Sequence, residues 1–215
     1  MILLLSGGQD STALLFHSLS RGIVNIHALT INYGQSHTRE VEAACCVVAV
    51  AQLYFPKAKI THEVLNLGRN VLVQETGTDI TPARNLLFLT IAANRCATVG
   101  ESVIGIGACF NDATTFADCR PEFIAAARAP ISLSLTGYPS GITILAPLID
   151  KTKKEIVDIC SEIVGCDEAI ALSHTCYLGT DEPCMKCAAC IARAAGFKAA
   201  NKADPLWIRI SQSRI

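Results

Sequence analysis

The first strand and helix of the fold are predicted by MILLLSGGQDSTALL, residues 1–15. The apolar run of residues 2–5 is typical of a strand buried on both faces, and residues 10–20 have the apolar period of a helix. Between them lies the hexapeptide SGGQDS, residues 6–11. A glycine-rich turn between a buried strand and a helix can bind phosphate, because backbone N–H groups and the positive end of the helix both face the anion.

The hexapeptide supplies the candidate phosphate-binding residues. Its serines add hydroxyl donors, and its aspartate can cap the helix or hold a Mg²⁺ ion. The motif is not a Walker A loop, which needs Gly-Lys-Ser/Thr, nor a dinucleotide fingerprint, which needs G-x-G-x-x-G. A tight turn without a ligand is the alternative, but the complete hexapeptide after the first strand favours phosphate. The candidates are Ser6, Gly7, Gly8, Gln9, Asp10 and Ser11.

Strand and helix patterns alternate along the rest of the chain. Further strands are predicted at residues 23–31, 60–65, 102–107 and 142–145, and helices at 37–54, 84–98, 120–135 and 152–163. Strands separated by helices indicate a parallel sheet with helices on both faces. We therefore expect an α/β fold with a doubly wound, five-stranded parallel sheet over residues 1–165. Residues 66–82, which contain glycines and polar residues, are expected to form a loop.

Composition and charge limit the classes of function. Of the 215 residues, 51% are hydrophobic and 17% are charged, so disorder over most of the chain is excluded. A formal net charge of -1 gives no overall attraction to nucleic acid or anionic membranes, although a local basic patch remains open. The apolar run of residues 2–5 is too short for a signal sequence or a membrane span, so we expect a cytoplasmic protein with no membrane partner.

Four of the eleven cysteines form a metal-binding pattern, C-x7-C-x2-C-x2-C. Four thiolates can enclose one Zn²⁺ ion and leave no open coordination position, so we expect a structural zinc site. An iron–sulfur cluster and a redox Cys-x-x-Cys pair are the alternatives. His174 could be a spare ligand, but a fourth cysteine makes it unnecessary. The candidate ligands are Cys176, Cys184, Cys187 and Cys190.

The cysteine pattern also sets the expected division of the chain. We expect a zinc-binding C-terminal segment at residues 166–200, with a short alanine-rich helix after the cysteines. Residues 201–215 form a tail without a clear period. Cys45, Cys46, Cys96, Cys160 and Cys166 are most simply buried small hydrophobic residues. Cys119, between an aspartate and an arginine, is the candidate for reactivity.

The hexapeptide resembles the SGGxDS signature of the PP-loop ATP pyrophosphatases. This resemblance implies cleavage of ATP between the α- and β-phosphates with an adenylated intermediate. Further segments resemble the 7-cyano-7-deazaguanine synthases of the queuosine pathway, in family order over nearly the whole chain. They are Tyr33-Gly34-Gln35 with His37, Arg84-Asn85, Asp118-Cys119-Arg120, Pro147-Leu148 with Lys153 and Glu155, and Thr175-Cys176-Tyr177.

The family resemblance implies a reaction in two stages. ATP adenylates the carboxylate of 7-carboxy-7-deazaguanine, and ammonia displaces AMP to give an amide. A second ATP activates the amide oxygen, and loss of AMP leaves the nitrile. The protein mainly has to position the reactants and neutralise phosphate charge. The expected ligands are therefore ATP, Mg²⁺, Zn²⁺, a deazaguanine carboxylate and ammonia, and the resemblance implies a homodimer.

The resemblance also assigns roles to individual residues. Arg84 and Lys153 are the expected cationic partners of the phosphates and, with Asp10, the candidate catalytic residues. A surface ion pair at Arg84 and a solvated helix face around Lys153 are the alternatives. Adenosine should pack at the end of the second strand. The further nucleotide-binding candidates are Thr30, Tyr33 and Gln35, and the candidates for binding the acceptor are Asn85, Asp112, Phe116, Asp118 and Arg120.

The acceptor side departs from the family pattern. The family typically has an acidic residue where Phe110 stands, an aromatic residue at Ala113, Gly-Tyr-Pro at residues 115–117 and glycine at Ala83. A carboxylate would accept hydrogen bonds from the guanine-like N–H edge, and an aromatic ring would stack on the base. Simple divergence of the pocket is one explanation. The other is an offshoot with changed acceptor chemistry.

Two alternative functions follow. The offshoot would stop at the amide, or would join a deazaguanine-type carboxylate to a protein or nucleic acid, as in antiphage defence or DNA modification. A zinc-ribbon module that binds nucleotide without chemistry is the second alternative. That module needs a basic or aromatic face, and residues 176–190 offer only Lys186 and Tyr177.

Overall fold

The computed structural model describes residues 1–35, 39–68, 71–76, 78, 80–135, 141–180 and 182–212. Within these ranges, five strands form one parallel sheet in the order β3-β2-β1-β4-β5. They are β1 (Ile2–Leu4), β2 (Asn25–Asn32), β3 (Lys59–Asn66), β4 (Val103–Gly105) and β5 (Thr143–Leu145). The predicted α/β class with a five-stranded parallel sheet is therefore confirmed.

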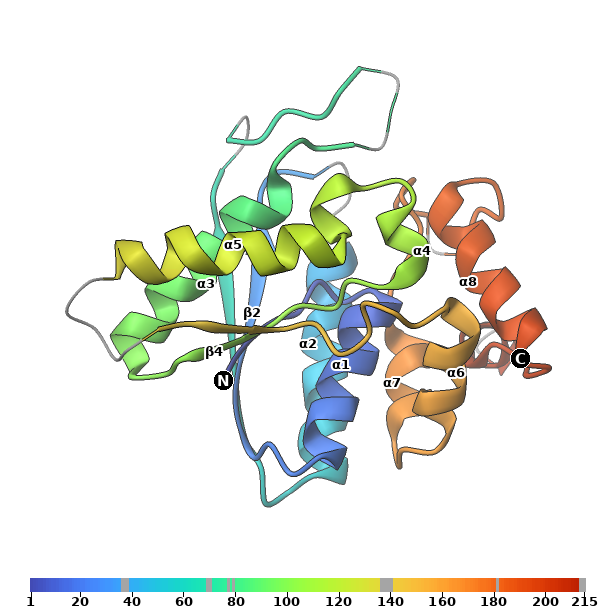
Figure 1. The fold of residues 1–215 in the computed structure, drawn as a ribbon. Coiled ribbons are helices and arrows are strands. Elements are labelled where there is room, and N and C mark those ends of the chain that lie inside the picture. The colour runs from blue at the N-terminus through green and yellow to red at the C-terminus, as the bar shows by residue number, and fades with distance from the viewer. Residues whose placement is uncertain are drawn as a thin grey trace.

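Helices cover both faces of this sheet (Figure 1). One face packs against α1 (Gln9–Ser20), α2 (Arg39–Tyr54), α6 (Lys153–Ser161) and α7 (Cys166–Leu172), and the other packs against α3 (Arg84–Val99) and α5 (Pro121–Ser134). Successive side chains of a strand point to opposite faces. Accordingly, Leu3 and Leu5 lie in the first core, and Ile2 and Leu4 lie in the second. Because both faces are covered, β1 is a continuous apolar run.

The strand order places a crevice at the carboxyl ends of β1 and β4. The chain runs from β1 to β2 and β3 on one side of the sheet, and then crosses to β4 and β5 on the other side. Ligands of open α/β sheets bind where the strand order reverses in this way. Two short helices after β4, α4 (Phe110–Ala113) and the 3₁₀ helix η1 (Ala117–Cys119), border the crevice and were not predicted.

The C-terminal part packs against the main body. Helix α8 (Ala188–Ala199) contacts α6, and α9 (Pro205–Gln212) contacts α7, whose residues lie in the first core. Gly196 of α8 makes this contact close, because a Cβ atom there would lie 2.7 Å from Lys153 Cβ. No apolar period was recognised in residues 201–215, but this tail contains helix α9.

The segment between β3 and α3 is a loop in its described residues, as predicted. It arches over the carboxyl edge of the sheet (Figure 1). Among the helices of the described residues, none is long and apolar enough to cross a membrane.

Candidate active site

The phosphate loop joins β1 to α1 and presses against α2. Gly7 has a φ of +87°, and a Cβ atom there would lie 2.1 Å from the backbone oxygen of Glu40, so only glycine fits. Ser6 Oγ lies 3.0 Å from Ser11 Oγ and accepts a hydrogen bond from Gly8 N (3.2 Å). No side chain caps α1 at Gly8, so the first-turn N–H groups remain directed at the loop. The loop thus has the geometry of an anion site.

A buried lysine faces this loop. Lys153 is the first residue of α6, and its backbone N–H donates to Asn111 Oδ1 (2.9 Å). Its Nζ donates to Asp10 Oδ2 (2.5 Å) and lies 3.7 Å from Asp112 Oδ1. Burial would lower the pKa of Lys153, but the two carboxylates outweigh burial and raise it. The side chain is therefore a cation at neutral pH, fixed beside the loop.

The two carboxylates around this lysine could also hold a metal ion. Ligand atoms of Asp10, Cys109 and Asp112 lie within 4.8 Å of one another, and Asp10 Oδ1 is buried without a partner in the described part of the chain. Burial and the charge of Asp10 raise the pKa of Asp112, while Lys153 opposes this rise. Burial raises the pKa of Cys109 to about 12, so its thiol stays protonated. The oxygen donors fit Mg²⁺, and the thiol does not take part.

The crevice has an aromatic wall at the end of β2. Arg84 Nη1 lies 3.5 Å from Tyr33 OH, and the guanidinium carbon lies 6.0 Å from the centre of the Phe88 ring. The Tyr33 and Phe88 rings are 5.5 Å apart. Thr30 Oγ1 donates to Leu5 O (2.7 Å) and lies 2.8 Å from His62 Nε2, so two protein groups already engage this hydroxyl. Gln35 Oε1 accepts from Tyr33 N (3.0 Å), which fixes the end of β2.

Another wall of the crevice contains a network of hydrogen bonds around Asn85. Its backbone N–H donates to Asp118 Oδ2 (2.9 Å), and its Nδ2 donates to Asp118 O (3.1 Å) and Cys119 Sγ (3.3 Å). Ala83, which precedes the helix, adopts a left-handed conformation with a φ of 56°. Burial and the charge of Asp112 raise the pKa of Cys119 to about 12. This pKa argues against the reactive thiolate that the sequence pattern suggested.

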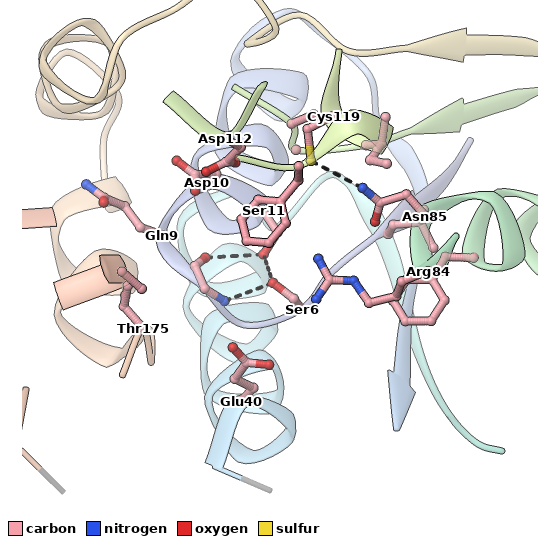
Figure 2. Close-up of a pocket in the computed structure, with 18 of the residues that line it drawn as sticks. Ser6, Gln9, Asp10, Ser11, Glu40, Arg84, Asn85, Asp112, Cys119 and Thr175 are labelled. Carbon is pink, nitrogen blue, oxygen red and sulfur yellow. Dashed lines mark hydrogen bonds between the residues drawn. The ribbon is translucent and has the colours of Figure 1, made fainter. Parts of the chain in front are cut away.

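One cavity of ≈ 400 Å³ joins these groups. Figure 2 shows Arg84 and Glu40 extending toward Ser6, with Asp10 and Asp112 together on another side. Predicted residues that line the cavity are Ser6, Gly8, Gln9, Asp10, Ser11, Thr30, Tyr33, Gln35, Arg84, Asn85, Asp112, Phe116 and Lys153.

The remaining predicted residues lie elsewhere. Gly7 lies behind the loop, and Asp118 contacts Asn85 from outside the lining. Arg120 is exposed, and its Nε donates to Ala113 O (3.1 Å). His37, a candidate from the sequence, lies outside the described residues.

Several lining residues were not predicted as site residues, among them Glu40, Phe88, His174 and Tyr177. An acidic residue in the first turn of a helix is ordinarily explained by the helix dipole, so Glu40 carried no distinguishing signal. Phe88 has the spacing of a buried helix residue. Their place in the cavity depends on how α2 and α3 meet the sheet.

The four predicted zinc ligands lie together. Sulfur atoms of Cys176, Cys184, Cys187 and Cys190 all lie within 4.8 Å of one another. Zn–S bonds of about 2.3 Å in a tetrahedron place sulfurs about 3.8 Å apart, so the set fits one Zn²⁺ ion. The backbone N–H groups of Cys187 (3.3 Å) and Lys186 (3.4 Å) donate to Cys184 Sγ and lower the pKa of this thiol.

The segment that leads to the first zinc ligand touches the phosphate loop. His174 N donates to Gly7 O (2.9 Å). Arg193 of α8, which is only 2% exposed, holds this segment through hydrogen bonds to Ser173 Oγ (2.8 Å) and Thr175 Oγ1 (3.1 Å), and forms an ion pair with Asp204 (2.7 Å). Hydrogen bonds therefore connect the cysteine cluster to the phosphate loop through residues 173–175.

Known proteins resemble the chain over most of its length. Residues 1–201 match the family described as queuosine biosynthesis protein QueC. The chain is 36% identical to the 7-cyano-7-deazaguanine synthase of Gloeobacter violaceus, covering 96% of this chain and 94% of that one. It is also 36% identical to the synthase of Laribacter hongkongensis, covering 98% of this chain and 95% of that one.

A solved structure, a 4-thiouridine synthetase–RNA complex with bound ATP, superposes with a TM-score of 0.52 and 21% identity. The match covers 79% of this chain and 42% of that one. At this level of identity the similarity concerns the fold alone.

Proposed function

The chain belongs to the QueC family of queuosine biosynthesis proteins, and we propose that it converts 7-carboxy-7-deazaguanine to 7-cyano-7-deazaguanine with ATP and ammonia. The main support is that a single cavity contains a phosphate loop, two cationic side chains and a separate polar wall. Such a cavity can hold an ATP α-phosphate and an acceptor carboxylate in contact. A homodimer and the zinc-binding role of the four cysteines are part of the same proposal.

In the first step, a carboxylate oxygen attacks the α-phosphorus of ATP, and pyrophosphate leaves. Hydroxyl groups of Ser6 and Ser11 and the N–H groups at the start of α1 bind the polyphosphate. Lys153 and Arg84 neutralise charge that builds up on the phosphate oxygens. When bound, Mg²⁺ would neutralise further phosphate charge, and Asp10 and Asp112 would hold it.

In the next steps, nitrogen replaces oxygen on the acceptor carbon. Ammonia attacks the acyl carbon, loses a proton, and AMP leaves with one former carboxylate oxygen. The amide oxygen then attacks a second α-phosphorus and releases pyrophosphate. The nitrogen gives up its two remaining protons as AMP leaves, and the nitrile forms. Both activated intermediates need the same alignment of carbonyl and phosphate, so one site can serve both stages.

The two substrates occupy different walls in this proposal. Adenosine packs against Tyr33 and Phe88 beside Thr30. The deazaguanine lies against Asn85, Asp112 and Phe116. Asp118 is a positioning residue, because it holds both the backbone and the side chain of Asn85. Arg120, which bonds to Ala113 O, orders the segment that carries Phe116.

The departures from the family pattern are mostly outside the cavity. Phe110 is 53% exposed, and neither it nor Ala113 is among the described lining residues. Thr115 and Phe116 do line the cavity. This placement supports the synthase over an offshoot with a different acceptor. An acidic residue at position 110 or an aromatic residue at position 113 would not line the cavity in this structure, so their loss does not remove a contact with the base.

The test is an assay with purified, zinc-loaded protein, ATP, Mg²⁺, ammonia and 7-carboxy-7-deazaguanine. AMP and the mass of the deazaguanine product are measured together. We expect two AMP for each nitrile formed. AMP with only the amide, or a deazaguanine adduct on a protein or nucleic acid, would favour the offshoot. Absence of AMP and pyrophosphate from protein that binds ATP would contradict the proposal and favour a binding module.

A further inference from the structure

An acidic side chain lies on the wall of the anion site. Glu40, in the first turn of α2, lines the cavity beside the phosphate loop. Its backbone oxygen is the atom that a Cβ at Gly7 would strike at 2.1 Å, so the helix and the loop cannot separate without losing this packing. Figure 2 shows the side chains of Glu40 and Arg84 both extending toward Ser6. A carboxylate here would repel a polyphosphate.

The groups around Glu40 only partly compensate its charge. Arg84 is the cation that acts on it, and Tyr33, His174 and Tyr177 line the same part of the cavity. Burial raises the pKa of Tyr177, so this phenol is neutral. Further along the cavity, the charge of Lys153 is already shared by Asp10 and Asp112.

This environment favours the neutral form of the carboxyl group. Burial raises the pKa of Glu40 to about 7, although Arg84 acts to lower it. Near neutral pH a large fraction of the free protein therefore carries a protonated Glu40. A nucleotide phosphate placed beside it brings further negative charge, which favours the protonated form still more. A protonated carboxyl group also has an O–H donor, which a phosphate oxygen can accept.

We propose that Glu40 takes up a proton when the nucleotide polyphosphate binds and donates its carboxyl O–H to a phosphate oxygen. Binding is thereby coupled to one proton, which is released when pyrophosphate leaves and the negative charge beside the carboxyl falls. This inference rests on the nucleotide site of the proposed function. It adds a neutral acid to the cations and N–H groups of the phosphate loop, and predicts that nucleotide affinity falls as pH rises.

The test uses the full-length, zinc-loaded protein and α,β-methylene-ATP with Mg²⁺, since this analogue cannot be cleaved at the α–β bond. Titration calorimetry in two buffers of different ionisation enthalpy gives the number of protons taken up at each pH. Measurements from pH 7 to pH 9 lie above the pKa of the terminal phosphate, which is about 6. Glu40→Gln keeps the shape and a hydrogen-bond donor, and the exposed Glu42→Gln on the same helix is the control.

We expect wild-type protein and the Glu42→Gln variant to take up close to one proton at pH 8. Their affinity should weaken by up to about tenfold per pH unit above pH 8. The Glu40→Gln variant should take up no proton through this group, show a flat pH profile, and bind more tightly than wild type at pH 9.

Two results would overturn the inference. One is nucleotide binding by wild-type protein with no proton uptake, which needs no variant and leaves the proposed function intact. The other is proton uptake that persists unchanged in a folded Glu40→Gln variant. Failure of wild-type protein to bind the nucleotide at any pH would instead reject the nucleotide site, and the inference with it.

Discussion

The two ends of the cavity are built differently. The phosphate end consists of consecutive residues at the junction of a buried strand and a helix, completed by Lys153 at the start of another helix. The acceptor end consists of side chains from α3, α4 and η1, several of which already bond to one another. Under the proposed function, a contiguous motif would fix where ATP lies, while acceptor choice would depend on two short helices outside the sheet.

The largest expected effect comes from removing zinc, because the zinc segment supports the phosphate end. Bound zinc in small sites contributes about 10–16 kcal/mol of apparent binding energy. Its loss should loosen the segment whose His174 N–H donates to Gly7 O, and the packing of α8 against Lys153. We predict that the Cys184→Ser variant binds no zinc, unfolds at a lower denaturant concentration and loses most of its affinity for ATP.

Zinc content, denaturant unfolding and nucleotide affinity should be measured on the same samples. Cys45→Ser is the matched control, since Cys45 lies far in sequence from the four ligands. Cys45 and Cys46 were predicted to be buried, but both are exposed on α2. Unchanged nucleotide affinity in folded, zinc-free protein would show that the phosphate end does not depend on the zinc segment.

Lys153→Met should abolish most AMP formation. The substitution keeps the apolar stem, but leaves Asp10 and Asp112 facing the phosphates without their cation. Loss of one preorganised electrostatic group typically lowers kcat by about 10²–10³-fold. Lys154→Met, which removes an exposed ion pair with Asp158 in the same helix, should retain activity. Steady-state AMP release is the measurement, and equal losses in both variants would argue against a catalytic Lys153.

Substitutions at two glycines distinguish the cost of a left-handed backbone conformation from the cost of a steric clash between the phosphate loop and α2. Gly7 and Gly22 have similar φ values, +87° and +84°, but a Cβ at Gly22 meets nothing within 4 Å. Gly22→Ala should cost about 1–2 kcal/mol of unfolding free energy from the left-handed conformation. Gly7→Ala should cost more and also weaken ATP binding, because its methyl group strikes Glu40 O. Equal losses of stability and normal ATP affinity in both would contradict the close contact.

The smallest effect is expected at the acceptor end. Phe116→Ala removes a ring from the cavity wall and should raise KM for the deazaguanine about tenfold, since stacking of a base on an aromatic ring is worth about 1–3 kcal/mol. The KM for ATP should change little. Phe110→Ala, at a side chain that is 53% exposed, is the control. If Phe110→Ala raises the acceptor KM as much, the acceptor lies outside this wall.

The difference between a contiguous phosphate end and an acceptor end built from separate short elements also explains which features could be predicted from the sequence. All five strands and five of the helices around them follow from the apolar period, and the phosphate loop follows from one continuous motif, but α7, which packs against the sheet, was not predicted. Helix α9 was missed because its apolar stripe is short, and α4 and η1 because segments of three or four residues have no measurable period. Glu40 joins the cavity through tertiary packing of α2 against Gly7, which no local pattern reports. The roles of the individual site residues remain predictions.

In the proposed reaction, the phosphate end and the acceptor end meet so that an acceptor carboxylate attacks the α-phosphorus of ATP. The most direct measurement uses 7-carboxy-7-deazaguanine labelled with ¹⁸O in both carboxylate oxygens, and mass spectrometry of the AMP released. We predict that each AMP carries one ¹⁸O atom, since the bond between carbon and the former carboxylate oxygen breaks at each displacement. Unlabelled AMP, formed at the same rate, would mean that water attacks the phosphorus, and would contradict the account.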